Sequence, residues 1–310
     1  MQISGTTVPT TDLDGEPPVV AVVGLGAMGS RIAANLVDEG HRVVVTNRTA
    51  AAVSGLVAAG ATSAASPRLA AAEADVVLVV VRDDDASRQV WTDHDHGVLA
   101  GLRPGAVGIE CSTVSPRWVT ELAGIAARAG ADFLEAPIVG SRPQAEARAL
   151  VHLLGGPQSV LDRVGPVLAV SAARLHRCGD VGAAATTKLV VNALLAIQVA
   201  AMAELLGVVE RSGLDLTDTI QLLTELPVTS PAAARAAGVM HAGAFAPNFP
   251  VDLVAKDLRY LTRLAAEQGG EAPMVAAALG EFGRSRAAGH GQDDLTAIAR
   301  THLRTERTHT

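Results

Sequence analysis

Aromatic residues and positive charge are both in short supply in this chain. Phe, Trp and Tyr make up only 2% of the 310 residues, which leaves few rings on which nucleic-acid bases could stack. The formal net charge is -7, so Lys and Arg are not in the excess that a phosphate backbone requires. These two shortages argue against a nucleic-acid partner.

Cysteines are equally few. Cys111 and Cys178 are the only two, which is too few for a disulfide framework, and they lack the Cys-x-x-Cys spacing of a zinc site. The aspartates at 83–85 and the histidines His94 and His96 lie in polar segments that are typical of solvated turns and helix starts. We therefore predict no metal site and a reducing, cytoplasmic location.

Targeting signals are also lacking. Residues 1–18 have neither a basic segment nor an apolar one, so they do not resemble a secretory signal, and we predict a flexible extension. The apolar run at 189–209 contains Asn192, Gln198 and Glu204, which would be costly at the centre of a bilayer. We interpret this run as a helix buried in protein and predict no membrane partner.

Short apolar segments alternate with helical patterns up to residue 180, and only helical patterns follow. This order predicts an α/β protein in which a doubly wound parallel sheet precedes an all-helical domain. The predicted strands are 19–23, 42–46, 76–81, 107–110, 132–136, 150–154 and 174–176. The predicted C-terminal helices are 181–211, 215–226, 231–241, 252–268 and 272–287.

A glycine-rich turn follows the first predicted strand and precedes a helical pattern, and its residues are Gly24, Leu25, Gly26, Ala27, Met28 and Gly29. In this setting Gly24 permits the turn, Gly26 lets the backbone approach a pyrophosphate, and Gly29 allows close helix packing. The pattern predicts a Rossmann dinucleotide-binding domain over 19–180. A helical substrate and dimerisation domain over 181–303 and a frayed tail over 304–310 complete the predicted organisation.

The end of the second predicted strand bears on the choice of cofactor. Asn47, Arg48 and Thr49 stand where an NAD enzyme usually places an acidic residue for the ribose 2′-hydroxyl. A guanidinium at this point can pair bidentately with a 2′-phosphate. We therefore predict NADP(H) as the cofactor, held by these three residues and the glycine turn.

The predicted 181–211 helix carries two polar residues on one face. Lys188 and Asn192 are four residues apart, so their side chains lie one turn above the other. On an arbitrary helix, such a lysine reaches solvent and such an asparagine bonds locally. Beside a dinucleotide motif, we predict that Lys188 is a proton donor and acceptor.

Five segments in this order resemble the β-hydroxyacid dehydrogenase family, which includes 3-hydroxyisobutyrate dehydrogenase and the glyoxylate and succinic semialdehyde reductases. The resemblance covers about 20–301, and its segments are 24–48, 104–116, 132–140, 182–192 and 253–261. It implies a Rossmann domain, a long inter-domain helix at 181–211 and a helical domain that forms a homodimer.

The resemblance also assigns roles to single residues. It implies that Lys188 is the general acid or base and that Asn192 holds a small-molecule substrate. Cofactor contacts are expected at the ends of predicted strands and in the helical domain, at Val81, Arg82, Thr113 and Lys256. Substrate contacts are expected at Ser112, Val139, Gly140, Ser141 and Asp257.

One loop departs from the family pattern. The usual A-P-V-S-G-G reads Ala-Pro-Ile-Val-Gly-Ser here, so Val139 supplies no hydroxyl for a substrate carboxylate. Ser141 and Arg142 are the alternative donors to a substrate carboxylate, and the identity of the substrate is left open. We predict an NADP(H)-dependent oxidoreductase acting on a carbonyl or hydroxyl of a small acid, with imine reduction and non-catalytic dinucleotide binding as the alternatives.

Overall fold

The computed structural model describes residues 17–304, which form two compact units divided between Lys188 and Leu189. Of the extension predicted at 1–18 and the tail predicted at 304–310, residues 1–16 and 305–310 lie outside the described residues. The division falls inside helix α8 (Ala183–Arg211), whereas the sequence placed the domain boundary between residues 180 and 181. The two units are described separately.

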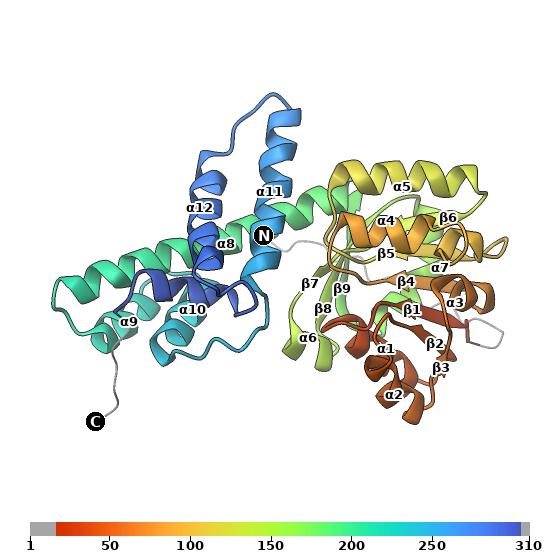
Figure 1. Ribbon diagram of the computed structural model, residues 1–310, viewed down its shortest axis with the longest axis horizontal. Coiled ribbons are helices and arrows are strands. Elements are labelled where there is room, and N and C mark those ends of the chain that lie inside the picture. The colour runs from red at the N-terminus through yellow and green to blue at the C-terminus, as the bar shows by residue number, and fades with distance from the viewer. Residues whose placement is uncertain (1–16, 305–310) are drawn as a thin grey trace. The chain divides into compact units, whose positions relative to one another are not determined.

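The first unit contains a nine-stranded sheet (Figure 1). Its order is β3-β2-β1-β4-β5-β6-β8-β7, and β9 pairs with β8. The strands are β1 (Val20–Val23), β2 (Val43–Thr46), β3 (Thr62–Ser63), β4 (Val76–Val79), β5 (Val107–Glu110), β6 (Asp132–Glu135), β7 (Ile138–Val139), β8 (Leu150–Gly155) and β9 (Ala172–Gly179). Pairing is parallel except where β8 meets β6 and β7. The doubly wound parallel sheet is confirmed, with an antiparallel section beyond β6.

Helices cover both faces of this sheet (Figure 1). Alternate residues of β1, Val20 and Val22 against Ala21 and Val23, enter separate hydrophobic clusters, as the two-residue repeat of a strand requires. One face packs on α1 (Gly29–Asp38), α2 (Ala51–Ala58), α6 (Arg142–Glu146) and α7 (Gln158–Ala169). The other packs on α3 (Pro67–Glu73), α4 (Asp84–Thr92), α5 (Pro116–Arg128) and Ala185 of α8.

The parallel register brings the carboxyl ends of four strands to one edge. Val23 of β1 is opposite Val79 of β4, Val79 is opposite Glu110 of β5, and Glu110 is opposite Glu135 of β6. The next residues of these strands therefore emerge side by side. Open α/β sheets bind their ligands along such an edge.

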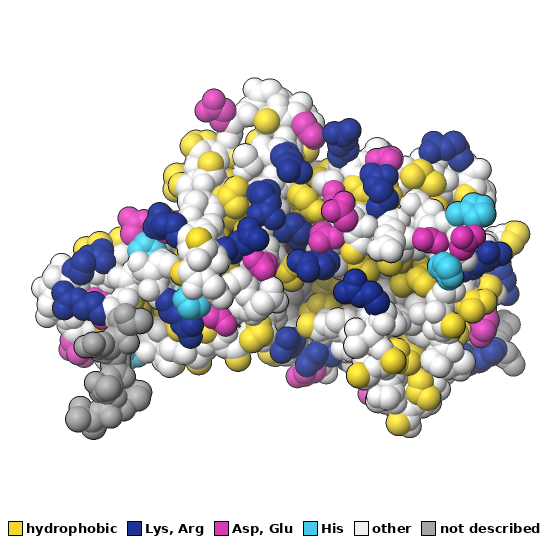
Figure 2. All heavy atoms as spheres, viewed as in Figure 1, with side chains coloured by type: hydrophobic (Ala, Val, Ile, Leu, Met, Phe, Trp, Pro, Cys, Tyr) yellow, Lys and Arg dark blue, Asp and Glu magenta, His cyan; other side chains and the backbone are white. Residues whose placement is uncertain are grey.

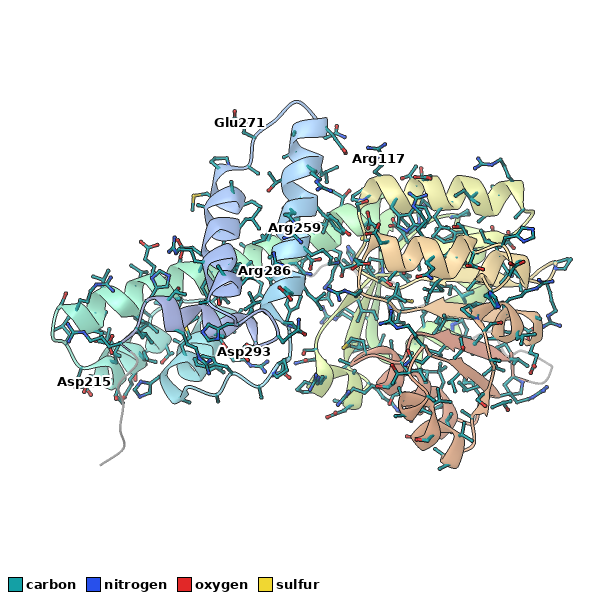
Figure 3. The ribbon with its side chains drawn as sticks, viewed as in Figure 1. Arg117, Asp215, Arg259, Glu271, Arg286 and Asp293 are labelled. Atoms are coloured by element: carbon teal, nitrogen blue, oxygen red, sulfur yellow. The ribbon has the colours of Figure 1, made fainter. Side chains whose placement is uncertain are left out.

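The second unit is helical. It consists of the rest of α8, α9 (Leu216–Glu225), α10 (Pro231–Ala242), α11 (Val251–Glu267), α12 (Pro273–Ala287) and a 3-10 segment, η2 (Leu295–Thr301). Helices α11 and α12 lie side by side, and Arg286 of α12 pairs with Asp252 at the start of α11 at 2.5 Å (Figure 3). Arg304, the first residue of the predicted tail, donates its backbone N–H to Glu210.

Helix α8 exposes apolar side chains along one face of the second unit. Those that are about half exposed are Val190, Leu194, Leu205 and Val208. By length and composition alone, α8 is the one helix among the described residues that is apolar enough to cross a membrane. Half of its most apolar window is buried in protein, and a core helix passes the same test. Over each unit, charged side chains of both signs are interspersed (Figure 2).

Candidate active site

The turn between β1 and α1 is built around three glycines with different surroundings. Gly24 has a φ of +94°, and a Cβ placed on it would lie 2.2 Å from the carbonyl oxygen of Val80. A Cβ on Gly29 would lie 2.0 Å from the carbonyl oxygen of Gly24. A Cβ on Gly26 would meet nothing within 4 Å. The first and last glycines are thus needed for packing, whereas the space at Gly26 lies open to a ligand.

The start of α1 suits an anionic ligand. Met28 stands at its N-cap without a side-chain cap, and the first turn, which begins at Gly29, contains no acidic residue. Ser30 N and Arg31 N donate to Gly26 O and Met28 O. The positive end of the helix dipole faces the glycine turn without a competing carboxylate. A dinucleotide pyrophosphate fits this turn, because it supplies negative charge and needs close backbone approach.

The end of β2 is tied to the glycine turn by Asn47. Its Oδ1 accepts a hydrogen bond from Leu25 N at 3.1 Å, and its Nδ2 donates to Thr49 O at 3.1 Å. Arg48 and Thr49 are exposed, and no salt bridge joins Arg48 to an acid among the described residues. Asn47 therefore fixes the loop, and the Arg48 guanidinium is presented beside it.

A buried carboxylate orders the ends of β4 and β5. Glu110 is fully buried and accepts hydrogen bonds from Ser87 Oγ, from Trp91 Nε1 at 2.9 Å and from Ser112 N at 2.8 Å. The Ser112 hydroxyl in turn accepts from Val81 N at 2.7 Å. Burial raises the pKa of Glu110 although these donors oppose the shift. The candidate residues Val81 and Ser112 are thus held together by contacts within the protein.

The polar run after β4 starts a helix. Asp83 caps α4 by accepting from Ala86 N, and Asp84 accepts from Ser115 N and Oγ. The interpretation of these aspartates as a turn and helix start is therefore confirmed. Arg82 is exposed and pairs with Asp83 at 3.1 Å, while the candidate Thr113 is half-buried.

The loop after β6 has a distinctive chemistry. Gly140 has a φ of +128°, and Ser141 takes part in a capping box with Gln144, whose Oε1 lies 3.0 Å from Ser141 N. Val139 is half-buried, and Arg142 has a buried Nε without a hydrogen-bond partner. The Ser141 side chain is committed to the start of α6, whereas a donor of the Arg142 guanidinium is left unsatisfied.

Lys188 is the last residue of the first unit and is 7% exposed. It lies on the second turn of α8, whose N-terminus is anchored by Glu135. Glu135 Oε1 accepts from Gly182 N at 2.7 Å and Ala184 N at 2.9 Å, and Oε2 accepts from Ala185 N at 3.0 Å. Sequence analysis missed both Glu110 and Glu135, because a carboxylate at the end of a strand has no local pattern that names its partner.

The second unit holds the other candidates. Asn192 Nδ2 donates to Asp257 Oδ2 at 2.6 Å, and Lys256 Nζ lies 2.9 Å from Asp257 Oδ1. The Lys256–Asp257 contact meets the distance of an ion pair, although Oδ1 has no aligned hydrogen bond. Because its amide nitrogen is engaged by Asp257, Asn192 keeps its carbonyl oxygen available as an acceptor.

The glycine turn of the first unit is that of a dinucleotide-binding protein, and comparisons with known proteins give its family. A family model for the NAD binding domain of 6-phosphogluconate dehydrogenase matches residues 19–182. A model for the NAD-binding of NADP-dependent 3-hydroxyisobutyrate dehydrogenase matches residues 182–302. The chain belongs to the β-hydroxyacid dehydrogenase family.

Relatives span nearly the whole chain. It is 31% identical over 280 residues to 2-(hydroxymethyl)glutarate dehydrogenase of Eubacterium barkeri, covering 90% of this chain and 93% of the relative. It is 32% identical over 293 residues to a probable 3-hydroxyisobutyrate dehydrogenase of Mycobacterium bovis, covering 91% and 97%. The solved 3-hydroxyisobutyrate dehydrogenase of Mycobacterium tuberculosis with L-serine has a TM-score of 0.83 at 32% identity, covering 92% of this chain and 99% of that chain.

Two further solved structures are similar to this chain in fold. Psf3, solved in complex with NADP+ and 2-OPP, has a TM-score of 0.83 at 26% identity, covering 91% of this chain and 99% of Psf3. An imine reductase from a Pseudomonas species has a TM-score of 0.60 at 21% identity, covering 92% and 99%. The second likeness extends to the fold alone.

The raised pKa of Glu110 predicts how stability depends on pH. A carboxyl whose pKa is higher when folded than when unfolded adds stability that is fully present below its ordinary pKa, here 4.5. This stability is lost as pH rises through the folded pKa. The unfolding free energy of the wild type relative to Glu110→Gln should therefore be larger at pH 5 than at pH 8 in urea titrations.

Glu121→Gln is the matched control. The hydrogen bond from Arg88 lowers the pKa of this exposed carboxyl, so its contribution to the unfolding free energy changes only below pH 5. The difference between wild type and Glu121→Gln should stay constant from pH 5 to pH 8. A constant difference for Glu110→Gln as well would contradict the assignment of a raised pKa.

Proposed function

We propose that this protein is an NADP(H)-dependent oxidoreductase that interconverts a carbonyl and a hydroxyl on a small acid. The glycine turn is the observation that carries the proposal. A Cβ at Gly24 or Gly29 would clash with the backbone, whereas a Cβ at Gly26 would meet no protein atom within 4 Å. A turn built only for packing would not need a glycine at that middle position. The bound nicotinamide supplies or accepts hydride, and the chain's own residues bind, orient and exchange the proton.

Arg48 supports the choice of NADP(H). Asn47 holds the loop that presents this guanidinium, and no salt bridge neutralises it among the described residues. A guanidinium in this place suits a doubly charged 2′-phosphate better than an uncharged hydroxyl. The named cofactors of a matching family model and of Psf3 agree with this choice.

Lys188 is the proposed general acid in reduction and base in oxidation. An ammonium beside a carbonyl both polarises it and donates a proton as hydride arrives at carbon. Asn192 is the proposed partner for the substrate oxygen, because Asp257 fixes its amide and leaves its carbonyl oxygen to accept. The remaining sheet-end candidates would contact the cofactor, with Lys256 on α11.

The substrate is proposed to be a small acid, as the names of two relatives suggest. The loop at Val139 lacks the usual hydroxyl, and the Ser141 side chain already serves α6. We propose Arg142 as the carboxylate-binding residue, since its buried Nε lacks a partner. An unsatisfied buried donor costs about 1–3 kcal/mol, and a substrate carboxylate would relieve this.

A screen for NADPH oxidation tests the proposal. Glyoxylate, succinic semialdehyde, other short carbonyl acids and cyclic imines are compared at one enzyme concentration. The proposal expects the highest kcat/KM with a carbonyl acid. A preference for the imines would favour imine reduction, and tight NADPH binding without turnover of any compound would favour a non-catalytic role.

We also propose a homodimer through α8. The exposed apolar residues Val190, Leu194, Leu205 and Val208 lie within about 60° of one another around the helix and form one stripe. A stripe of this kind is stabilised when a second copy covers it. Light scattering at micromolar concentration should report a dimer that Leu194→Glu weakens, and a wild-type monomer would contradict the proposal.

Cofactor preference should depend on Arg48. Arg48→Ala should weaken NADPH binding by tens of fold and leave NADH binding nearly unchanged, because a charge-assisted hydrogen bond contributes about 1.5–3 kcal/mol. Binding is measured by titrating the quenching of protein fluorescence.

Gly26→Ala is the control for this measurement. Its methyl group meets no protein atom within 4 Å, so the fold should be unaffected, but it would obstruct the pyrophosphate that both cofactors share. This variant should weaken NADPH and NADH alike. Equal affinity of the wild type for the two cofactors would refute the role of Arg48.

A further inference from the structure

A single side chain joins the sheet of the first unit to the start of α8. Glu135, the last residue of β6, is 1% exposed and binds the backbone N–H groups of Gly182, Ala184 and Ala185. Four N–H groups at the start of a helix have no partner within the helix. One carboxylate therefore accepts hydrogen bonds from three backbone N–H groups at the start of this helix.

This cap differs from those of the other helices. Ser66, Asp83, Ser115, Asp215 and Ser230 each accept from the N–H three residues ahead, so they close a local turn. Glu135 lies 47 to 50 residues before the groups that it binds. Its contact thus fixes the position of the first turn of α8 relative to β6 rather than the shape of a loop.

The neighbouring strand leaves room for this carboxylate. Gly155 of β8 is paired with Glu135 in the sheet, and a Cβ on Gly155 would lie 2.1 Å from Glu135 Oε1. Its other close contacts are also Glu135 side-chain atoms, at 2.8 Å. A methyl group at residue 155 would therefore displace the carboxylate while leaving its charge in place.

The carboxylate is held in an environment that does not favour its charge. Burial raises the pKa of Glu135, the three backbone donors oppose this, and the nearby Glu110 carboxylate adds to the rise. No salt bridge to Glu135 occurs among the described residues. A neutral cap such as serine would satisfy an N–H group without burying a charge, so helix stability alone does not account for Glu135.

We propose that Glu135 is a positioning residue that sets the height and rotation of α8 and thereby places the Lys188 ammonium. Lys188 follows Ala185 by three residues, and each residue of a helix advances about 1.5 Å and turns about 100°. A small slip at Ala185 is transmitted directly to Lys188. This inference rests on the proposed role of Lys188 in catalysis.

The test compares Glu135→Gln with a control substitution, Asp215→Asn, at the N-cap of α9. Glu135→Gln keeps the shape of the side chain but turns an NH₂ group towards backbone donors. Asp215→Asn changes the cap of α9 in a comparable way (Figure 3). Turnover is followed with NADPH and succinic semialdehyde, or with the fastest carbonyl acid of the screen.

Glu135→Gln should lower kcat at least tenfold while the Kd for NADPH stays within about twofold, and Asp215→Asn should leave both unchanged. Hydrogen exchange at Gly182, Ala184 and Ala185 should quicken in Glu135→Gln and not in Asp215→Asn. Gly155→Ala should reproduce the loss of kcat, and adding Glu135→Gln to it should cause little further loss. If Glu135→Gln does not fold, Gly155→Ala alone applies the same displacement.

The Lys188→Met background separates this inference from the proposed function. Glu135→Gln should have no effect on the residual kcat there, because the group that it positions is absent. If Lys188→Met loses activity while Glu135→Gln and Gly155→Ala keep wild-type kcat, the positioning role is overturned and the catalytic role of Lys188 stands. If Lys188→Met keeps wild-type kcat, the role of Lys188 is overturned, and positioning through it falls as well.

Discussion

Parallel hydrogen bonding between β1, β4, β5 and β6 is the constraint on which the first unit depends. It aligns Val23, Val79, Glu110 and Glu135, so the chain leaves all four strands at one edge. The glycine turn follows the first of these residues, and the buried carboxylates end the last two. A ligand along this edge would meet backbone N–H groups and loop side chains from segments far apart in the sequence.

Buried carboxylates give this edge its order. Glu110 fixes the turn that contains Ser112, and Glu135 fixes the start of α8. Burial raises the pKa of both carboxyl groups. In the second unit, Asp257 orients Asn192 in a similar manner. Burying a charge is unfavourable unless it is well bonded, and here the bonds fix groups that carry the proposed chemistry.

Local patterns predicted most of the elements of the fold. The glycine turn between a strand and a helix needs only neighbouring residues, and the predicted C-terminal helices agree with α8 to α12 within about two residues at each end. The short strands β3 and β7 were missed, because two residues carry no periodicity. The strand predicted at 174–176 is longer, spanning Ala172–Gly179, because its half-exposed polar residues hide the pattern.

The candidate site was less accessible to sequence analysis. Lys188, Asn192 and Arg48 could be singled out by their spacing from recognisable elements. The contact between Asn192 and Asp257 joins residues 65 positions apart, and the one between Glu135 and Gly182 joins residues 47 apart. Such pairs depend on how strands and helices pack, so no local pattern names both partners.

The role of Lys188 as proton donor is the central claim about catalysis, and Lys188→Met tests it most directly. Methionine keeps most of the length and the apolar stem but removes the ammonium, so folding and the Kd for NADPH should be unchanged. Turnover of the best carbonyl acid should fall by about a hundredfold to ten-thousandfold, the usual contribution of general acid catalysis. A variant that keeps more than about a tenth of the wild-type kcat would contradict the account, because the proton would then have to come from another group.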